Sequence, residues 1–320
     1  MLHLRVLAPT EMTDEILECL EIDEAVSGLA VFRGAGVRPP GDLIMAQVAR
    51  EGANDIVQRL RERKVHQHGS IELEGVDTWM SRKGFDAELR TPGSSSDAVV
   101  WAQVAQRAYE DSELNWTYLS FLTMATVIAS IAIITDSEIL VVGAMVLGPE
   151  FGAIAALGVA LVRKRFVLLQ LAIRTLVVGF LVAIAVTLVL TLAGRGLGWI
   201  ALDDIVGARP NTAFIYTPDK WSFIVALIAG AAGVLSITSA KSIGLAGVFI
   251  SVTTVPAAGN IALGVAFLNG STIWGSVAQL FLNIAGMAIA GWLTLVVQER
   301  LWTRVSVRRA RHLRVPRRML

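Results

Sequence analysis

The chain has 320 residues and a formal net charge of only +1, but 54% of its residues are hydrophobic and its charged residues are unevenly placed. Residues 1–117 carry 20 acidic and 12 basic side chains, residues 118–297 carry 6 and 8, and residues 298–320 carry 1 and 8. A middle region so long and so poor in charge excludes an ordinary soluble protein. It predicts an integral membrane protein with a soluble N-terminal domain.

The N-terminal segment begins MLHLRVLAPTEMTDE, without a basic stretch followed by an unbroken apolar core. We therefore expect no cleaved signal peptide and a cytosolic N-terminal domain. The hydrophobic pattern predicts a ferredoxin-like domain over residues 1–89, with elements in the order β-α-β-β-α-β. The expected strands are 2–8, 26–34, 42–50 and 69–78, and the expected helices are 12–22 and 52–63. Residues 90–116 are predicted to form a linker and a connecting helix.

Residues 117–297 predict a mainly α-helical transmembrane domain with six spans. The expected spans are 117–135, 138–162, 166–193, 221–240, 243–268 and 272–297. With the N-terminus in the cytosol, the basic loop 163–165, Lys241 and the Arg-rich tail 298–320 all fall on the cytosolic side, as the positive-inside rule requires. We therefore expect a multi-pass protein of the cell (plasma or inner) membrane with both termini in the cytosol.

Two of these spans carry similar motifs. Pro149-x-x-Gly152 in span two resembles Pro256-x-x-Gly259 in span five, and ALGVAL (156–161) resembles ALGVAF (262–267), with one residue of slippage between the matches. Six spans then divide into two inverted three-helix repeats with broken helices two and five, a pattern typical of transporters with a midplane binding site. The alternative is that the prolines only kink helices and that such strings recur by chance.

The residues near the two prolines form the predicted substrate or ion site. A proline interrupts a helix and favours a new start, so each downstream half can present its positive N-terminal end inside the membrane. Glu150 is ionisable at that depth, where it either caps its own helix or binds a cation or proton. The charge preference of the site therefore remains undecided. The candidate residues are Gly148, Pro149, Glu150, Gly152, Ser251, Thr253, Thr254, Pro256, Asn260 and Asn283.

The segments VVGAMVLGPEFGAI, AGVFISVTTVP and LFLNIAG, in this order, resemble the membrane family called the uncharacterised hydrophobic domain, domain of unknown function 389. The resemblance covers about 116–297. The family pattern maps onto Gly143, Ala144, Met145, Pro149, Val255, Pro256 and Asn283. The sequence departs from the pattern at Glu150, where an apolar residue is expected, and at Ala257, where a second proline is often found. The resemblance implies no substrate.

Together these features favour a membrane transport protein, either a secondary transporter or an ion-conducting protein, with a cytosolic regulatory or dimerisation domain. The alternative is a non-transporting membrane sensor or scaffold whose prolines only shape helix packing. The sequence contains no catalytic motif, so no enzyme activity, cofactor or metal is expected. The expected partners are the bilayer, with anionic lipids at the Arg-rich tail, a second copy in a dimer and an unknown small solute or ion, but no nucleic acid.

Overall fold

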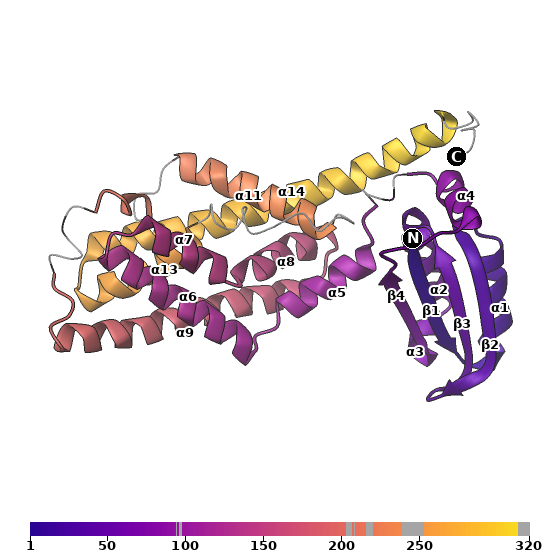
Figure 1. Cartoon of the computed structure of the whole chain (residues 1–320), viewed down its shortest axis with the longest axis horizontal. Helices are drawn as coiled ribbons and strands as arrows, with labels where there is room; N and C mark the ends of the chain where they lie inside the picture. Colours follow the sequence, from indigo (N-terminus) through magenta and orange to yellow (C-terminus); the bar gives the residue numbers. More distant parts are fainter. Residues whose placement is uncertain are drawn as a thin grey trace. The chain divides into compact units, whose positions relative to one another are not determined.

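The computed structural model describes residues 1–93, 95, 98–202, 207, 209–215, 220–238 and 253–312, with Phe214 and residues 301–312 described by their backbone alone. The chain divides into two compact units. The N-terminal unit is built mainly from Met1–Ala105, and the helical unit begins at Gln106 and extends to Val297. Figure 1 labels the helices and strands of both units.

The N-terminal unit contains a four-stranded antiparallel sheet in the order β2-β3-β1-β4. Its elements are β1 (Leu2–Ala8), α1 (Thr10–Glu21), β2 (Val26–Val37), β3 (Pro40–Val48), the 3-10 turn η1 (Arg50–Gly52), α2 (Ala53–Glu62), α3 (Val65–His68), β4 (Ser70–Gly75) and α4 (Arg82–Arg90). The predicted β-α-β-β-α-β order is confirmed. The short α3 and the helix α4 were not predicted.

Alternation of apolar residues along the strands explains which face of this sheet is buried. On β1, Leu2, Leu4 and Val6 are fully buried, whereas Arg5 between them is exposed. Successive side chains on a strand point to opposite faces, so this pattern places one face against a core and leaves the other toward solvent. The buried face packs with Ile16 of α1 and Ile56 of α2.

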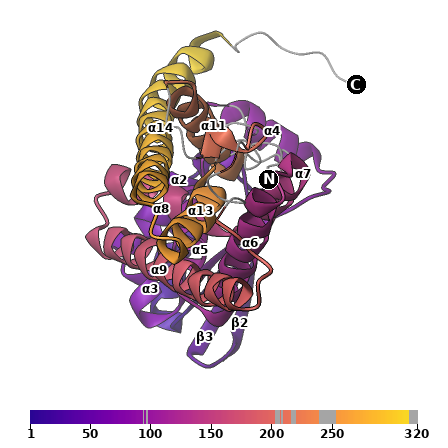
Figure 2. The same cartoon turned by 90° about the vertical axis from the view of Figure 1, so that its left-hand side faces the viewer.

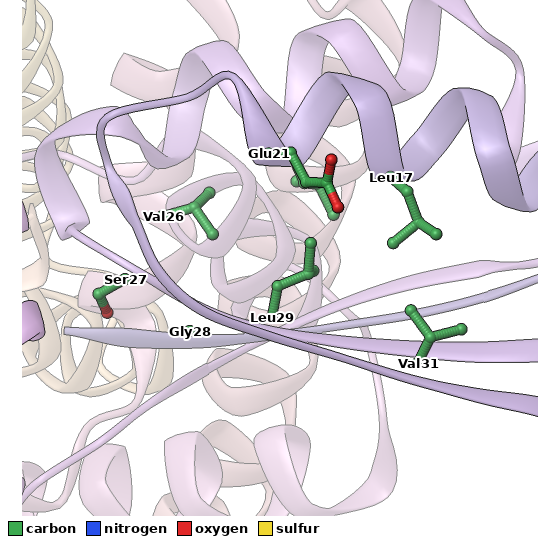
Figure 3. A pocket seen from close by; sticks show the side chains of 8 residues that line it. Leu17, Glu21, Val26, Ser27, Gly28, Leu29 and Val31 are labelled. Atoms are coloured by element: carbon green, nitrogen blue, oxygen red, sulfur yellow. The ribbon is translucent and has the colours of Figure 1, made fainter.

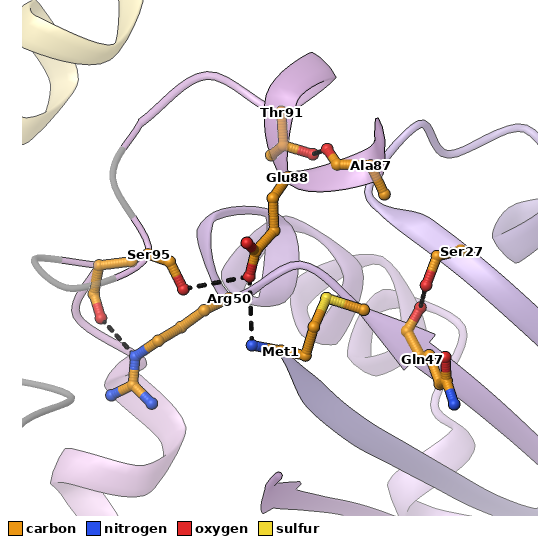
Figure 4. Close-up of polar contacts among 9 residues, drawn as sticks. Met1, Ser27, Gln47, Arg50, Ala87, Glu88, Thr91 and Ser95 are labelled. Atoms are coloured by element: carbon orange, nitrogen blue, oxygen red, sulfur yellow. Dashed lines mark hydrogen bonds and ion pairs between the residues drawn. The ribbon is translucent and has the colours of Figure 1, made fainter. Parts of the chain in front are cut away.

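Helix α4 has hydrogen bonds at its start and near its end, and those near its end join it to the rest of the N-terminal unit. Ser81 precedes the helix, and its hydroxyl accepts a hydrogen bond from the Gly84 N–H at 3.1 Å, as expected of an N-cap. The amino terminus of Met1 donates to Glu88 Oε1 at 3.3 Å, and the Ser95 hydroxyl donates to the same oxygen (Figure 4). The sequence pattern missed α4 because its nine residues are mostly polar and only a few of them are apolar.

Among the described residues of the helical unit, four helices are long and apolar enough to cross a membrane. They are α6 (Trp116–Ile134), α9 (Phe166–Gly196), α11 (Lys220–Thr238) and the part of α14 (Gly270–His312) that runs from Gly270 to Arg300. A fifth candidate span is the bent pair α7 (Glu138–Leu147) and α8 (Glu150–Val162). These helices correspond to five of the six predicted spans. The helix α5 (Trp101–Asp111) is the predicted connecting helix.

The predicted span 243–268 is represented by the short helix α13 (Thr254–Ala266), and its residues before 253 lie outside the described residues. Both α8 and α13 are 13 residues long, and almost all of their side chains are buried. The longer helices expose large apolar side chains, such as Leu181 on α9 and Phe281 on α14. In Figure 2, α8 and α13 lie between α11 and α14 above and α9 below.

Candidate functional site

The break between α7 and α8 positions Glu150. Helix α7 ends at Leu147, Gly148 and Pro149 follow in non-helical conformations, and α8 begins at Glu150 with its axis bent by 54° from α7. Proline lacks an N–H and clashes with the preceding turn, so a helix ends before it and restarts after it. The break predicted at Pro149 is therefore confirmed, and Glu150 occupies the first position of the new helix.

Glu150 is held by the first residue of the other short helix. The Thr254 hydroxyl donates to Glu150 Oε1 at 2.6 Å, and only 7% of Glu150 is exposed. The other carboxylate oxygen, Oε2, is buried and has no hydrogen-bond partner among the described residues. A Cβ on Gly148 would overlap Oε2 and would lie 2.7 Å from Val255 Cγ2. Glycine at 148 is thus what leaves room for the folded-back carboxylate.

Pro256 lies differently from Pro149. Helix α13 begins at Thr254 with Thr253 as its N-cap residue, so Pro256 is the third residue of the helix. Its missing N–H costs no hydrogen bond there, since the first turn of a helix has no internal partner for its N–H groups. The prediction that the two prolines occupy equivalent places is therefore wrong: Thr253, and not Pro256, occupies the place that Pro149 has before α8.

Thr253 joins the site to α14. Its hydroxyl oxygen accepts hydrogen bonds from Asn283 Nδ2 at 3.0 Å and from Gln279 Nε2 at 3.3 Å. Both amide side chains are almost completely buried, and Gln279 Oε1 has no hydrogen-bond partner in the described parts of the chain. Because Thr253 and Thr254 are adjacent in the chain, this amide pair and the Glu150 carboxylate belong to one polar cluster inside the helical unit.

Asn260 contacts α14 further along α13. Its Nδ2 donates to the Ser276 hydroxyl at 2.9 Å, whereas its Oδ1 is buried and finds no partner among the described residues. Ser276, Gln279 and Asn283 are spaced three and four apart, so they lie on one face of α14, directed at α13. Asn260 and Asn283 were predicted site residues, whereas Ser276 and Gln279 were not, although their spacing from Asn283 places them on the same helix face.

A second acidic residue, Asp111, lies close to the start of α8 because Gly152 has no side chain there. A Cβ on Gly152 would lie 2.7 Å from the Cβ and 2.9 Å from Oδ2 of Asp111, the last residue of α5. Burial raises the pKa of Asp111 above its usual value, and the nearby Arg107 only partly opposes this effect. Nothing in the sequence placed Asp111 near α8, since it lies outside the apolar spans.

The remaining predicted site residue, Ser251, lies outside the described residues. The structure therefore brings together Gly148, Pro149, Glu150, Thr253, Thr254 and Asn283, with Gly152 and Pro256 in the first turns of α8 and α13 and Asn260 further along α13.

The N-terminal unit has a separate, open cavity of about 340 Å³ between α1 and β2 (Figure 3). Its lining consists of apolar side chains with few polar groups: Leu17, Leu20, Glu21, Val26, Ser27, Gly28, Leu29 and Val31. This cavity offers no cluster of directed polar groups comparable with the one around Glu150.

Comparisons with known proteins agree with the resemblance found in the sequence. The family described as a domain of unknown function (DUF389) matches residues 145–289. An uncharacterized protein of Methanocaldococcus jannaschii is 30% identical over 149 residues, which cover 47% of this chain and 44% of that protein. The match thus spans less than half the length of this relative. No solved structure matches the chain.

Proposed function

We propose that the chain is a membrane transport protein, either a secondary transporter or an ion-conducting protein. The family that residues 145–289 match is described only as a domain of unknown function, which assigns no activity. The proposal is therefore argued from the geometry of the site. The substrate or ion site lies where α8 and α13 begin. The observation that carries this proposal is the 2.6 Å hydrogen bond from Thr254 to Glu150, the first residues of the two short, buried helices.

The lengths of the two helices support a site at membrane depth. A helix of 13 residues spans about 20 Å at 1.5 Å per residue, whereas the hydrocarbon core of a bilayer is about 30 Å thick. Such a helix, enclosed by longer spanning helices, begins inside the hydrocarbon region. Polar backbone at that depth must be buried in protein or line a wet cavity, which is what discontinuous helices of transporters do.

A structural repeat with an offset of 104 residues supports the inverted three-helix arrangement. Glu150 and Thr254, which are 104 residues apart, both begin helices of 13 residues. At the same offset, α9 begins at Phe166 and α14 begins at Gly270. The turns after α8 and α13 also correspond, since Lys164 and Leu268 both have positive φ values, of 51° and 54°.

Packing between the halves fits a pseudo-two-fold axis. Gly259 of α13 lies against Ser130 of α6, in the first half of the membrane domain. In the reverse direction, Phe151 of α8 lies against Gly233 of α11, and Gly158 lies against Trp292 of α14. Each short helix thus contacts long helices of the other half as well as of its own, and the Glu150–Thr254 hydrogen bond joins the two short helices.

With three spans in each half, the second half enters the membrane with opposite polarity. The full arrangement is then six transmembrane helices in two inverted repeats, with both termini in the cytosol and the N-terminal ferredoxin-like domain as a regulatory unit. The two helix N-termini meet at Glu150 from opposite sides of the bilayer. A rocking of one half against the other would expose this site to each side in turn.

Currents from proteoliposomes on a solid-supported membrane test the proposal. The wild type, Glu150→Gln and the control Glu138→Gln are compared under rapid jumps of ions and small solutes. Glu138 is exposed on α7 and outside the cluster, so it matches the chemical change without touching the site. We expect a solute-specific or ion-specific current in the wild type and the control that is lost in Glu150→Gln. A folded wild-type protein that gives no current, and no tracer uptake under the same gradients, would favour a sensor or scaffold.

A further inference from the structure

The unpartnered groups around Glu150 indicate which class of ligand the site takes. This inference rests on the proposed function and deepens it. We propose that the site binds a small monovalent cation, a proton or an alkali ion, on Oε2 of Glu150, and that this cation is the transported or coupling species.

Among the residues that the structure describes, no basic side chain balances the charge at Glu150. Glu150 is buried, and no described side chain forms an ion pair with it. A carboxylate deep in a membrane protein is unfavourable unless a counter-charge or a proton accompanies it. An external cation or a proton supplies what the neighbouring side chains do not.

The alternative role for Glu150 is to cap the helix N-termini, whose partial positive charges favour an anionic group. In that role both carboxylate oxygens would receive donors from the protein. Oε1 accepts from the Thr254 hydroxyl, but Oε2 is buried and receives no donor from the residues that the structure describes. One oxygen is thus anchored, and the other is left for a ligand.

Two further buried side-chain oxygens lack donors among the described residues, one in the cluster and one further along α13. Gln279 Oε1 and Asn260 Oδ1 are buried oxygens without donors, while the amide nitrogens of the same side chains are hydrogen-bonded. Oxygen-rich surroundings of this kind suit hard cations, which prefer carboxylate, carbonyl and hydroxyl ligands. An anion would have to approach Glu150 with Asp111 also near the start of α8, so the charges disfavour it.

Few titratable groups face Glu150. Asp111 approaches α8 from α5, and Tyr118 of α6 lies within electrostatic range, with a buried hydroxyl that has no hydrogen-bond partner. The described parts of α13 and α14 contribute neutral groups, namely the threonines and amides of the cluster. Arg195 of α9 donates instead to the Ala266 carbonyl, at the far end of α13. Among the described residues, Asp111 is therefore the other acidic group near the start of α8, and no basic side chain of the cluster competes with a cation at Glu150.

Thermal unfolding of the purified full chain in detergent tests binding without any transport readout. Lithium, sodium and potassium chloride are titrated at fixed pH, with N-methylglucamine chloride as the control for ionic strength. Infrared difference spectra between low and high pH report whether a buried carboxyl loses a proton. The variants are Glu150→Gln and Thr254→Val, with Glu138→Gln as the matched control.

Two results support the proposal and separate the two cations. A saturable rise of the unfolding midpoint with one alkali ion, lost in Glu150→Gln and kept in Glu138→Gln, identifies an alkali ion. A buried carboxyl band that titrates in the wild type and the control, is missing in Glu150→Gln and is shifted in Thr254→Val identifies a proton. Thr254→Val keeps the test available if Glu150→Gln does not fold.

The proposal is overturned if the wild type shows neither the alkali effect nor a titrating buried carboxyl. It is also overturned if transport currents exist but are unchanged when the cations and pH are varied, in which case the proposed function stands. If the protein binds a cation at Glu150 but transports nothing, the cation site is supported and the proposed transport function is wrong.

Discussion

Gly148 determines, at the scale of single residues, where the Glu150 carboxylate can lie. An added Cβ at 148 would overlap Oε2 and press against Val255, so Gly148→Ala is expected to displace the carboxylate from Thr254. The displaced atoms are the end of a flexible side chain, so the protein should still fold, with a loss of stability of about 1–3 kcal/mol. We expect the current and the cation effect of Gly148→Ala to resemble those of Glu150→Gln.

The control for this change is Gly143→Ala on α7, where an added Cβ meets no atom within 4 Å. Alanine is a better helix former than glycine by about 1 kcal/mol, so the control should be as stable as the wild type or more so. If both alanine variants behave alike in current and in thermal unfolding, the position of Glu150 does not depend on Gly148.

Thr254 supplies the only side-chain donor found for Glu150 among the described residues. Thr254→Val keeps the shape but removes the hydroxyl, which leaves both buried carboxylate oxygens without a donor. The expected loss is about 1–3 kcal/mol in the free energy of unfolding, together with altered cation binding. Thr254→Ser retains the hydroxyl and should retain binding. Equal cation affinities in the valine and serine variants would show that this hydrogen bond does not matter.

Asp42, in the N-terminal unit, gives a prediction about pH. Hydrogen bonds from the Gly34 N–H and from the Thr13 hydroxyl hold the pKa of Asp42 below its ordinary value of 3.8. A lowered pKa in the folded state contributes stability that is complete above the unfolded-state pKa and is lost as pH falls through the folded-state pKa. Protection of the β1 and β3 amides from hydrogen exchange should therefore decrease below about pH 4.

In Asp42→Asn the same protection factors should be lower at neutral pH and should depend less on pH in this acid range. Protection that falls equally steeply in the wild type and in Asp42→Asn would mean that another group causes the acid sensitivity.

The contact between α13 and α6 determines, at the scale of the elements, where the second short helix lies. A Cβ on Gly259 would lie 2.9 Å from Ser130 Oγ and 3.0 Å from the Thr126 carbonyl oxygen, which belongs to the backbone and cannot move aside. Gly259→Ala should therefore push α13 away from α6, lower the unfolding midpoint by an amount equivalent to about 1–3 kcal/mol, and weaken cation binding.

The matched change is Gly270→Ala at the first residue of α14, where an added Cβ meets open space. This variant should keep the wild-type midpoint. Equal midpoints for Gly259→Ala and Gly270→Ala would contradict the close packing of α13 on α6.

The relation between the two short helices was only partly predictable from the sequence. The motif matches give offsets of 107 residues for the prolines and 106 for the ALGV strings, whereas the structure relates Glu150 to Thr254 at 104. Small apolar residues are interchangeable in packed membrane helices, so letters can match out of register. The helix starts and the turns at Lys164 and Leu268 are features of the backbone. They relate the two halves at one constant offset, which the matching amino-acid strings do not.

At the scale of the whole molecule, the sequence predicted the elements that follow from local patterns, but it did not predict contacts between distant residues. The alternating apolar residues of β1 and the apolar runs of α6 and α9 are local signals, and the elements that they predicted are present. The approach of Asp111 to Gly152 joins residues that no local pattern relates. Thr254 was a predicted site residue because it precedes a proline. Its hydrogen bond to Glu150 was not predictable, because it depends on how α8 and α13 pack in the folded protein.

The central claim is that two halves of opposite polarity bring α8 and α13 together at Glu150. It is tested most directly by the sidedness of the two equivalent turns, Lys164 and Leu268, which are exposed. Cys19 is the only cysteine, so Cys19→Ser provides a background for Lys164→Cys and Leu268→Cys. The measurement is labelling of each variant in intact cells by a membrane-impermeant thiol reagent, before and after permeabilisation. We expect Leu268→Cys to react in intact cells and Lys164→Cys only after permeabilisation. Reaction of both from the same side of the membrane would contradict the inverted arrangement, and with it the shared site.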